Sequence, residues 1–267
     1  MTTVKTIRAL SRGLDVLRHL ETGGATLHAL AARTKLPKAT LLRILATLER
    51  EGYVRRGIAD QLYHHNFRPT RPPETGWKAV LAEVAGPVLD GLCHKVLWPS
   101  DVGVYEDGAI RVQETSRRIS PFLLNRDVLD HEIHVLQSAM GRAFLAWSDE
   151  ERREKVLARL SRSRDLHNRL ARDREKVAAL VSNVRDRGYA VREPGYFITQ
   201  PREARVSAIA VPVFLDARSV GAINLAWVSS AMSEQAFVAQ HLPSLKSAAR
   251  EISAGVDVRF KHARTVR

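Results

Sequence analysis

The sequence of 267 residues has little of what several classes of protein require. It contains one cysteine, Cys93, which excludes an internal disulfide and a zinc site built from several cysteines. No apolar run approaches the ~20 residues of a transmembrane helix, and residues 1–10 lack the apolar core of a signal peptide. We therefore expect a cytoplasmic protein with no membrane partner.

Motifs of enzymes and of cofactor-binding proteins are missing as well. There is no glycine-rich phosphate loop, no Gly-x-Ser-x-Gly turn and no His-Glu-x-x-His motif. His131 and His134 flank a carboxylate, but together they offer too few ligands for a metal. Cys93 lies in an apolar helical stretch, which is typical of an inert buried cysteine. We predict no enzyme activity, no catalytic residue, no metal and no cofactor; an enzyme acting on a small organic acid remains an alternative.

Positive charge is what the sequence has in excess. The 42 lysines and arginines outnumber the 29 acidic residues, which gives a net charge of +13. Residues 1–75 hold 13 basic and 6 acidic residues, so about half of the excess lies in the first part of the chain. This asymmetry favours a nucleic-acid-binding module there, although a merely basic surface would give the same count.

A proline-rich stretch divides the chain. Three prolines and a glycine fall between Phe67 and Gly76, a composition that ends helices and central strands. We predict an N-terminal domain over residues 1–66, a linker over 67–80 and a second domain over 81–260.

The first domain has the pattern of a winged helix-turn-helix. Apolar spacing predicts helices over about 7–21, with Leu10, Leu14, Val16, Leu17 and Leu20 on one apolar face, and over 27–34 and 38–51. Thr26 is predicted to cap the second helix. A basic hairpin follows, with strands at 53–56 and 61–64 around a turn.

The third helix and the hairpin carry the predicted contacts with DNA. In such a module the third helix enters the major groove and the hairpin lies beside it. A guanidinium can contact guanine or phosphate, and a hydroxyl can contact phosphate or base edges. The predicted DNA-binding residues are Lys38, Thr40, Arg43, Thr47, Arg55 and Arg56. The alternative is an amphipathic helix with a solvated polar face.

Residues 77–267 mix helical and strand patterns. Helices are predicted over 77–96, with a break or offset at Gly86-Pro87, over 138–147, 149–160 and 166–187, with Ser148 as a cap between the second and third, and over about twenty residues after Ser233. Strands are predicted over 101–105, 109–113, 206–214 and 220–228. The mixture predicts an α/β (α+β) fold in which helices cover a single sheet.

Several segments resemble a known family. Residues 11–17 (SRGLDVL), 36–48 (LPKATLLRILATL) and 51–54 (EGYV) are similar, in order and spacing, to the DNA-binding domain of IclR-family bacterial transcriptional regulators. Residues 138–146 (SAMGRAFLA) and 209–214 (IAVPVF) resemble the effector-binding domain of that family. Ala39 departs from the serine that many members carry. Within the family, residues 98–102, 230–233 and 241–243 resemble the activators of hydroxyphenylpropionate catabolism.

The resemblance implies a regulator with a GAF-like effector-binding domain. It implies a homodimer or tetramer on a double-stranded DNA operator, a small, aromatic organic acid as effector, and control of a catabolic operon. Effector binding would change the domain geometry or the affinity for RNA polymerase. A nucleic-acid-binding protein without an effector is a further alternative.

The resemblance also implies which residues surround the effector. The residues that match the family's pocket are Met140, Gly141, Ile198, Ala208, Asn224 and Ala226. Ile198, Ala208 and Ala226 are apolar, which fits an aromatic or alkyl body. Backbone amides near Gly141, at the start of a predicted helix, could hold a carboxylate.

Overall fold

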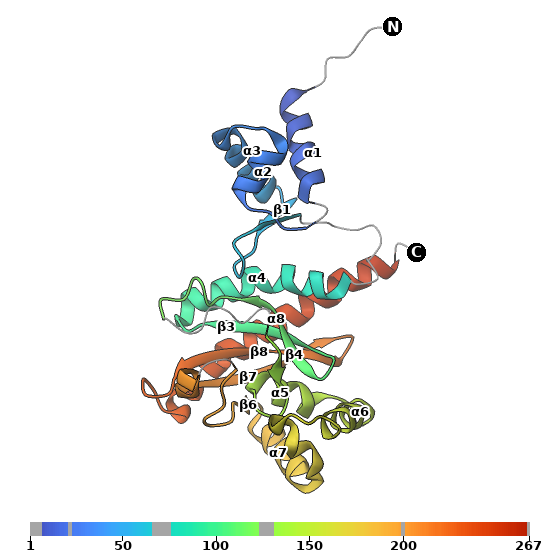
Figure 1. Ribbon diagram of the computed structural model, residues 1–267, viewed down its shortest axis with the longest axis vertical. Coiled ribbons are helices and arrows are strands. Elements are labelled where there is room, and N and C mark those ends of the chain that lie inside the picture. Colours follow the sequence, from blue (N-terminus) through green and yellow to red (C-terminus); the bar gives the residue numbers. More distant parts are fainter. Residues whose placement is uncertain (1–6, 21–22, 66–75, 123–130, 199–200, 266–267) are drawn as a thin grey trace. The chain divides into compact units, whose positions relative to one another are not determined.

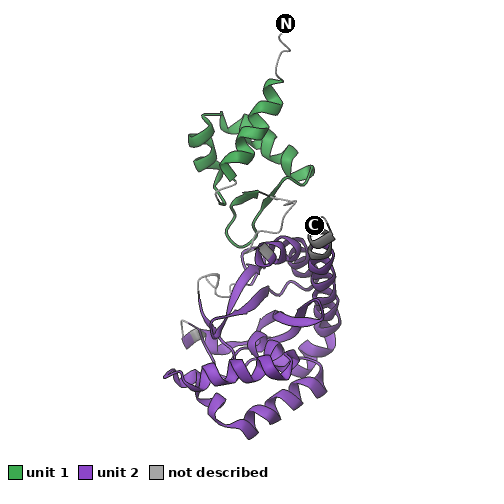
Figure 2. Ribbon diagram, turned by 90° about the vertical axis from the view of Figure 1, so that its right-hand side faces the viewer, with its two compact units in different colours: residues 1–71 green, residues 72–267 purple. Residues whose placement is uncertain are grey.

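The chain forms two compact units, residues 1–71 and 72–267 (Figure 2). The computed structural model describes residues 7–20, 23–65, 76–122, 131–198 and 201–265, and only the backbone of Gly76, Arg202 and 260–265. Of the predicted linker, residues 67–75 lie outside the described residues and 76–80 are helical. No helix in the described ranges is long and apolar enough to cross a membrane.

Unit 1 is a winged helix-turn-helix, as predicted. Its described residues form three helices and a small antiparallel sheet: α1 (Arg8–Leu20), α2 (Leu27–Thr34), α3 (Lys38–Arg50), β1 (Val54–Arg56) and β2 (Tyr63–His65). The Oγ1 atom of Thr26 accepts a hydrogen bond of 3.1 Å from the amide of Ala29, which confirms the predicted cap of α2.

Helix α1 buries only part of its predicted apolar face. Val16 and Leu20 are buried in the core of unit 1 as expected, whereas Leu10 and Leu14 are 58% and 46% exposed. The prediction was therefore wrong for these two leucines. Residues 7–12 are all exposed, because the rest of unit 1 covers only the C-terminal half of α1.

The hairpin is shorter than predicted. Gln61 has a positive φ of 62°, and the amide of Leu62 donates a 2.9 Å hydrogen bond to Oδ1 of Asp60. The return strand therefore begins at Tyr63 and not at Gln61. Nε2 of His64 lies 2.8 Å from Oδ2 of Asp60, a contact that fastens the loop to β2.

Unit 2 is built on one antiparallel sheet between two layers of helices (Figure 1). The strands lie in the order β5-β4-β3-β8-β7-β6. In chain order they are β3 (Ser100–Glu106), β4 (Ala109–Thr115), β5 (Ile133–His134), β6 (Ala190–Val191), β7 (Val206–Leu215) and β8 (Arg218–Val228). The predicted sheet covered by helices is confirmed.

The helices of unit 2 divide between the two faces of the sheet. One face is covered by α4 (Gly76–Val96) and α8 (Glu234–Thr265) (Figure 1). The other is covered by α5 (Ala139–Trp147), with α7 (Arg174–Arg187) behind it. The remaining helical segments are α6 (Glu150–Ser161) and the 3₁₀ helices η1 (Leu166–Arg172) and η2 (Pro201–Arg205).

Strand alternation creates two separate cores. Along β8, Ile223, Leu225 and Trp227 pack against α4 and α8. Ala222 and Ala226 point to the α5 side, and the alternation places Asn224 between them on that side. The α5 face of β8 is therefore made of small residues and one amide.

Ser148 is the C-cap of α5, which agrees with the predicted cap between two helices, and Asp149 is the N-cap of α6. Three predictions about helices need correction. The helix predicted over 166–187 is divided, because Asp173 is extended and its carboxylate accepts a hydrogen bond from the amide of Lys176, which caps α7. Helix α4 continues through Pro87, where a break or offset was predicted. Helix α8 has 32 residues instead of about twenty and continues through Pro243.

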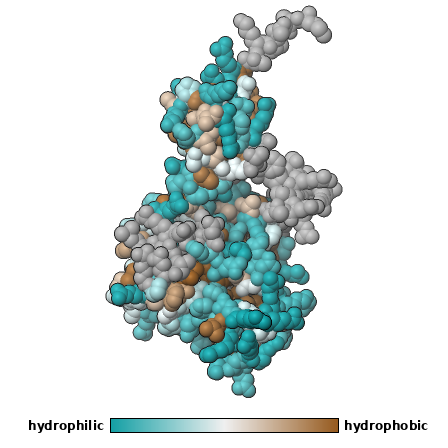
Figure 3. Space-filling view, viewed as in Figure 1, coloured by the Kyte–Doolittle hydropathy of each residue, from teal (hydrophilic) through white to brown (hydrophobic). Residues whose placement is uncertain are grey.

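The arginine-rich segments of unit 2 form an exposed polar surface. Arg174 pairs with Glu154 at 2.6 Å, and Arg159 with Asp107 at 3.3 Å. The lower part of the surface in Figure 3, where α6 and α7 lie in Figure 1, is mainly hydrophilic. Solvent and neighbouring carboxylates therefore balance much of this charge.

Candidate functional site

Helix α3 has one exposed face opposite its core stripe. Leu41 and Leu45 are buried against α1 and α2, and Lys38, Arg43 and Thr47 are exposed. Thr40 is half-buried at the edge of this face. The hydroxyl of Thr47 donates to the carbonyl of Arg43 at 2.9 Å, so its oxygen still has lone pairs that can accept a hydrogen bond.

Other residues of this face were not among the predicted contacts. Leu42 is 46% exposed, and Ala39, Ala46 and Arg50 lie beside it on the exposed side. The two alanines let a partner approach the helix backbone closely, and an apolar side chain can contact the methyl group of thymine. The sequence could have indicated the exposure of Leu42, because it follows the core residue Leu41 directly and so lies off the core stripe of the helix.

The hairpin adds positive charge at the C-terminal end of α3. The amide of Tyr53 bonds to the carbonyl of Leu48, which joins the hairpin directly to the helix. Arg55 is half-buried and Arg56 is exposed, with its guanidinium 5.7 Å from the centre of the Tyr63 ring. The structure thus places both predicted hairpin arginines beside α3 within unit 1.

In unit 2 the predicted effector residues gather on the α5 side of the sheet. Met140, Ala208 and Ala226 are buried in one cluster, and Ile198 packs against it partly buried. Ala208 and Ala226 are direct partners across β7 and β8. Together these residues form an apolar surface, called here the alanine face after two of its members: Met140, Ile198, Ala208 and Ala226.

Gly141 lies in the first turn of α5, where the backbone is tightly packed. A Cβ atom at this position would lie 2.2 Å from the carbonyl oxygen of Val135. The amide of Gly141 donates at 3.0 Å to Oγ of Ser138, the N-cap of α5. This amide is therefore already paired in the structure, and the glycine is needed for close packing of the helix.

Asn224 finds its hydrogen-bond partner within the protein. Its Oδ1 accepts from the amide of Asp101 at 2.8 Å, and its Nδ2 donates to Oδ2 of Asp101 at 3.0 Å. Arg117 donates from Nε and Nη2 to the two oxygens of Asp101 at 2.8 and 2.7 Å. Asn224 thus joins the alanine face to a buried ion pair.

The electrostatics of this ion pair are set by burial and by the guanidinium. Burial favours a higher pKa for Asp101, but the charge of Arg117 and hydrogen bonds from Arg117, Thr115 and Asn224 outweigh it, so the pKa lies below its ordinary value. Asp101 is therefore an ion at neutral pH.

Arg192 is a residue that the sequence analysis missed. It follows β6, and its amide donates to the carbonyl of Ala208 at 2.9 Å, next to the alanine face. Its buried guanidinium donates to the carbonyl oxygens of Tyr196 at 2.5 Å and Glu203 at 3.3 Å. Burial lowers the pKa of Arg192, and the nearby charge of Arg117 acts in the same direction. An anion bound here would offset that unfavourable burial of charge.

A separate cluster in unit 2 contains possible metal ligands. Single ligand atoms of His134, Asp165 and His167 all lie within 4.8 Å of one another. His131 and His134 alone offer too few ligands for a metal, and His131 is not in this cluster. The additional groups begin at Asp165, 31 positions after His134. Cys93 is buried, and burial raises the pKa of its thiol, in line with the inert role predicted.

The winged helix-turn-helix defines a DNA-binding protein, and here it is joined to a separate α/β domain. Residues 9–57 match the model of the IclR helix-turn-helix domain, and residues 78–254 match that of the bacterial transcriptional regulator IclR C-terminal domain. The chain belongs to the IclR family of DNA-binding transcriptional regulators, which combine a helix-turn-helix with an effector-binding domain and are not enzymes.

Solved structures of the same fold extend over nearly the whole chain. A transcriptional regulator from Rhodococcus sp. RHA1 has 25% identity and a TM-score of 0.52, with 95% of this chain and 99% of that chain covered. An IclR-family regulator from Brucella abortus has 21% identity and a TM-score of 0.53, covering 94% and 93%. An IclR homolog from Microbacterium hydrocarbonoxydans, complexed with 4-hydroxybenzoate, has 22% identity and a TM-score of 0.52, covering 94% and 99%.

Proposed function

We propose that this protein is a ligand-responsive regulator that acts in the cytoplasm and controls a catabolic operon. It binds a double-stranded DNA operator through Lys38, Thr40, Arg43, Thr47, Arg55 and Arg56. Its effector is a small aromatic acid, with hydroxyphenylpropionate as the specific candidate. The effector changes either the geometry of the DNA-binding units or the affinity for RNA polymerase.

One observation carries the choice of effector: the backbone of a buried arginine, Arg192, bonds to the edge of the apolar alanine face. Met140, Ile198, Ala208 and Ala226 offer a surface for a ring, and Arg192, hydrogen-bonded through its backbone to Ala208, offers a positive charge for a carboxylate. Gly141 and Asn224 complete the site by holding α5 and the Asp101 ion pair in place. The 4-hydroxybenzoate bound by the Microbacterium homolog has the same two chemical parts, which supports the proposal.

The function is tested with the full chain and the DNA upstream of its own gene and the neighbouring operons. Gel-shift titrations with competitor DNA should give a sequence-specific complex whose affinity changes when 4-hydroxybenzoate or hydroxyphenylpropionate is added. If unrelated competitor DNA displaces the complex as well as unlabelled operator DNA does, the result would favour the effector-independent nucleic-acid-binding protein. Chemical conversion of the acid would favour the enzyme alternative.

Replacing Ala226 by leucine is expected to weaken effector binding by about 5- to 150-fold. The added methyl groups overfill the alanine face, and overpacking costs roughly 1–3 kcal/mol. Calorimetric titration with the aromatic acid measures the change, while DNA affinity without effector should stay at the wild-type value. Ala248→Leu is the matched control, because Ala248 is buried in the core on the other side of the sheet. Equal acid affinity in the two variants would contradict the position of the site.

An exposed apolar stripe on α1 supports a homodimer. Ile7, Leu10 and Leu14 are 69%, 58% and 46% exposed and recur at helical spacing. Such a stripe on a DNA-binding module fits a second copy of the chain, since two modules bind a two-fold symmetric operator.

The double variant Leu10→Lys and Leu14→Lys is expected to convert a dimer to monomers, or a tetramer to dimers. Lysine is a good helix former, so α1 itself should remain folded. Sedimentation equilibrium of the full chain measures the change in mass. Leu166→Lys is the control, because Leu166 is 81% exposed but lies in unit 2. An unchanged mass for the double variant would exclude this stripe as the interface.

A further inference from the structure

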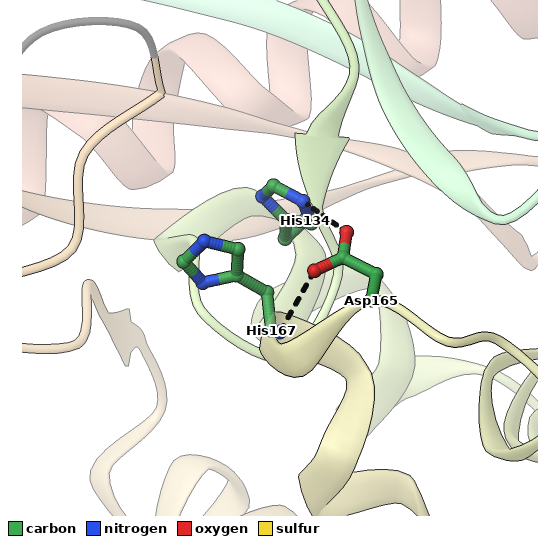
Figure 4. Close-up of side chains that lie close together, drawn as sticks. All are labelled: His134, Asp165 and His167. Carbon is green, nitrogen blue, oxygen red and sulfur yellow. Dashed lines mark hydrogen bonds and ion pairs between the residues drawn. The ribbon is translucent and has the colours of Figure 1, made fainter.

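Three side chains with metal-ligating groups meet where β5 ends and η1 begins (Figure 4). His134 is the last residue of β5, Asp165 caps η1, and His167 lies in its first turn. One ligand atom of each lies within 4.8 Å of the other two. Neither the proposed DNA contacts nor the proposed effector contacts include these residues.

Hydrogen bonds hold the Asp165 carboxylate against the imidazole of His134 and the backbone amide of His167. Nε2 of His134 lies 2.8 Å from Oδ2 of Asp165, and Oδ1 of Asp165 accepts the amide of His167 at 2.9 Å. The centres of the two imidazole rings are 4.3 Å apart. The arrangement is therefore fixed by the backbone of η1 as well as by the side chains.

Tyr196 orients His134 for ligation. Its hydroxyl oxygen accepts the amide of His134 at 3.1 Å and lies 2.9 Å from Nδ1 of the same residue. In a metal-bound form Nδ1 would carry the proton and donate to this oxygen, and the lone pair of Nε2 would bind the metal in place of its hydrogen bond with Asp165. Histidines that bind metals commonly donate their second ring N–H to an oxygen in this way.

We propose that His134, Asp165 and His167 bind a divalent transition-metal ion through two imidazole nitrogens and one carboxylate oxygen. Two imidazoles favour zinc and its transition-metal neighbours over Mg²⁺ and Ca²⁺, which prefer oxygen ligands throughout. Three protein ligands leave coordination positions for water or a small ligand.

Metal binding would require only a small change in the positions of the three ligand atoms. Around tetrahedral zinc with bonds of about 2.0–2.2 Å, ligand atoms lie about 3.3 Å apart. His134 and Asp165 are already closer than this, so rotation of the half-buried His167 side chain closes the set. Asp165 is exposed, which gives an ion a path from solvent.

The test uses the full chain without a histidine tag, stripped with EDTA and titrated with Zn²⁺ against a chromophoric chelator. We expect one site per chain that His167→Gln weakens at least about tenfold, the loss that removal of even an outer-shell partner causes. His94→Gln is the matched control and should bind like the wild type. His94 also pairs with an aspartate, Asp90 at 3.6 Å, but its side chain is 74% exposed and belongs to no cluster found in the described residues.

Asp165→Asn provides a second variant in which the capping oxygen is retained. It should weaken Zn²⁺ binding and change the visible absorption of bound Co²⁺, while circular dichroism stays like that of the wild type. Equal Zn²⁺ affinity in the wild type and in both cluster variants overturns the proposal. If His167→Gln does not fold, Asp165→Asn decides the outcome alone.

Discussion

Replacing Arg117 by methionine is expected to destabilise unit 2 by about 3–5 kcal/mol, the typical cost of leaving a buried charge without its partner. Asp101 is 1% exposed, and the guanidinium of Arg117 donates to both of its carboxylate oxygens. Urea unfolding followed by tryptophan fluorescence measures the loss. All four tryptophans, Trp77, Trp98, Trp147 and Trp227, lie in unit 2, so the signal reports on that unit alone.

The effect of Arg117→Met should depend on pH in a defined direction. In the wild type the pKa of Asp101 is lowered, so its contribution to stability is present above the unfolded-state pKa of about 3.9 and is lost as the pH falls through the folded value. Without the guanidinium, burial raises that pKa, and the variant gains stability as the carboxyl group becomes protonated. The difference between the two proteins should therefore be largest near neutral pH and shrink in acid.

Two further variants test whether the loss of stability in Arg117→Met comes from the unpaired charge of Asp101. Arg174→Met breaks an exposed ion pair with Glu154 and should cost at most about 1 kcal/mol. Adding Asp101→Asn to Arg117→Met removes the unpaired charge and should recover part of the loss. If Arg117→Met costs no more than Arg174→Met, the buried pair does not have the structural role assigned to it.

Replacing Arg43 by alanine is expected to weaken binding to the specific operator by about 5- to 150-fold, equivalent to 1–3 kcal/mol. Arg43 lies on the exposed face of α3, and a guanidinium there can form two hydrogen bonds with a guanine. Binding to unrelated DNA should change much less, because it depends on phosphate contacts. Salt-dependent gel shifts with operator and unrelated DNA measure both affinities.

Arg56→Ala provides the comparison for Arg43→Ala. Arg56 lies in the hairpin, where contacts are expected with phosphates, so its loss should weaken operator and unrelated DNA alike and lower the salt dependence. Arg18→Ala removes the same charge from an exposed position on α1, outside the helix-turn-helix, and should have little effect. Loss of affinity for both DNAs in Arg43→Ala would assign that residue to phosphate contact and not to base reading.

The sequence predicted unit 1 well because its signals are local. The leucine spacing of α3 and the cap at Thr26 each act within a few residues. The same local reasoning failed for Leu10 and Leu14. Periodicity identifies the apolar side of α1, but whether anything in unit 1 covers that side depends on how far the other elements extend.

In unit 2 the family, the mixture of strands and helices, and the small residues of the alanine face could all be predicted from the sequence. Which polar groups meet depends on the folded chain. Asp101 and Asn224 are 123 positions apart and pair because β3 and β8 are neighbours in the sheet. Arg192 reaches the alanine face through β6, and His134 meets Asp165 where β5 ends beside η1. Local patterns fix secondary structure because helix and strand periods act over a few residues, whereas these sites depend on strand order and helix packing between distant segments.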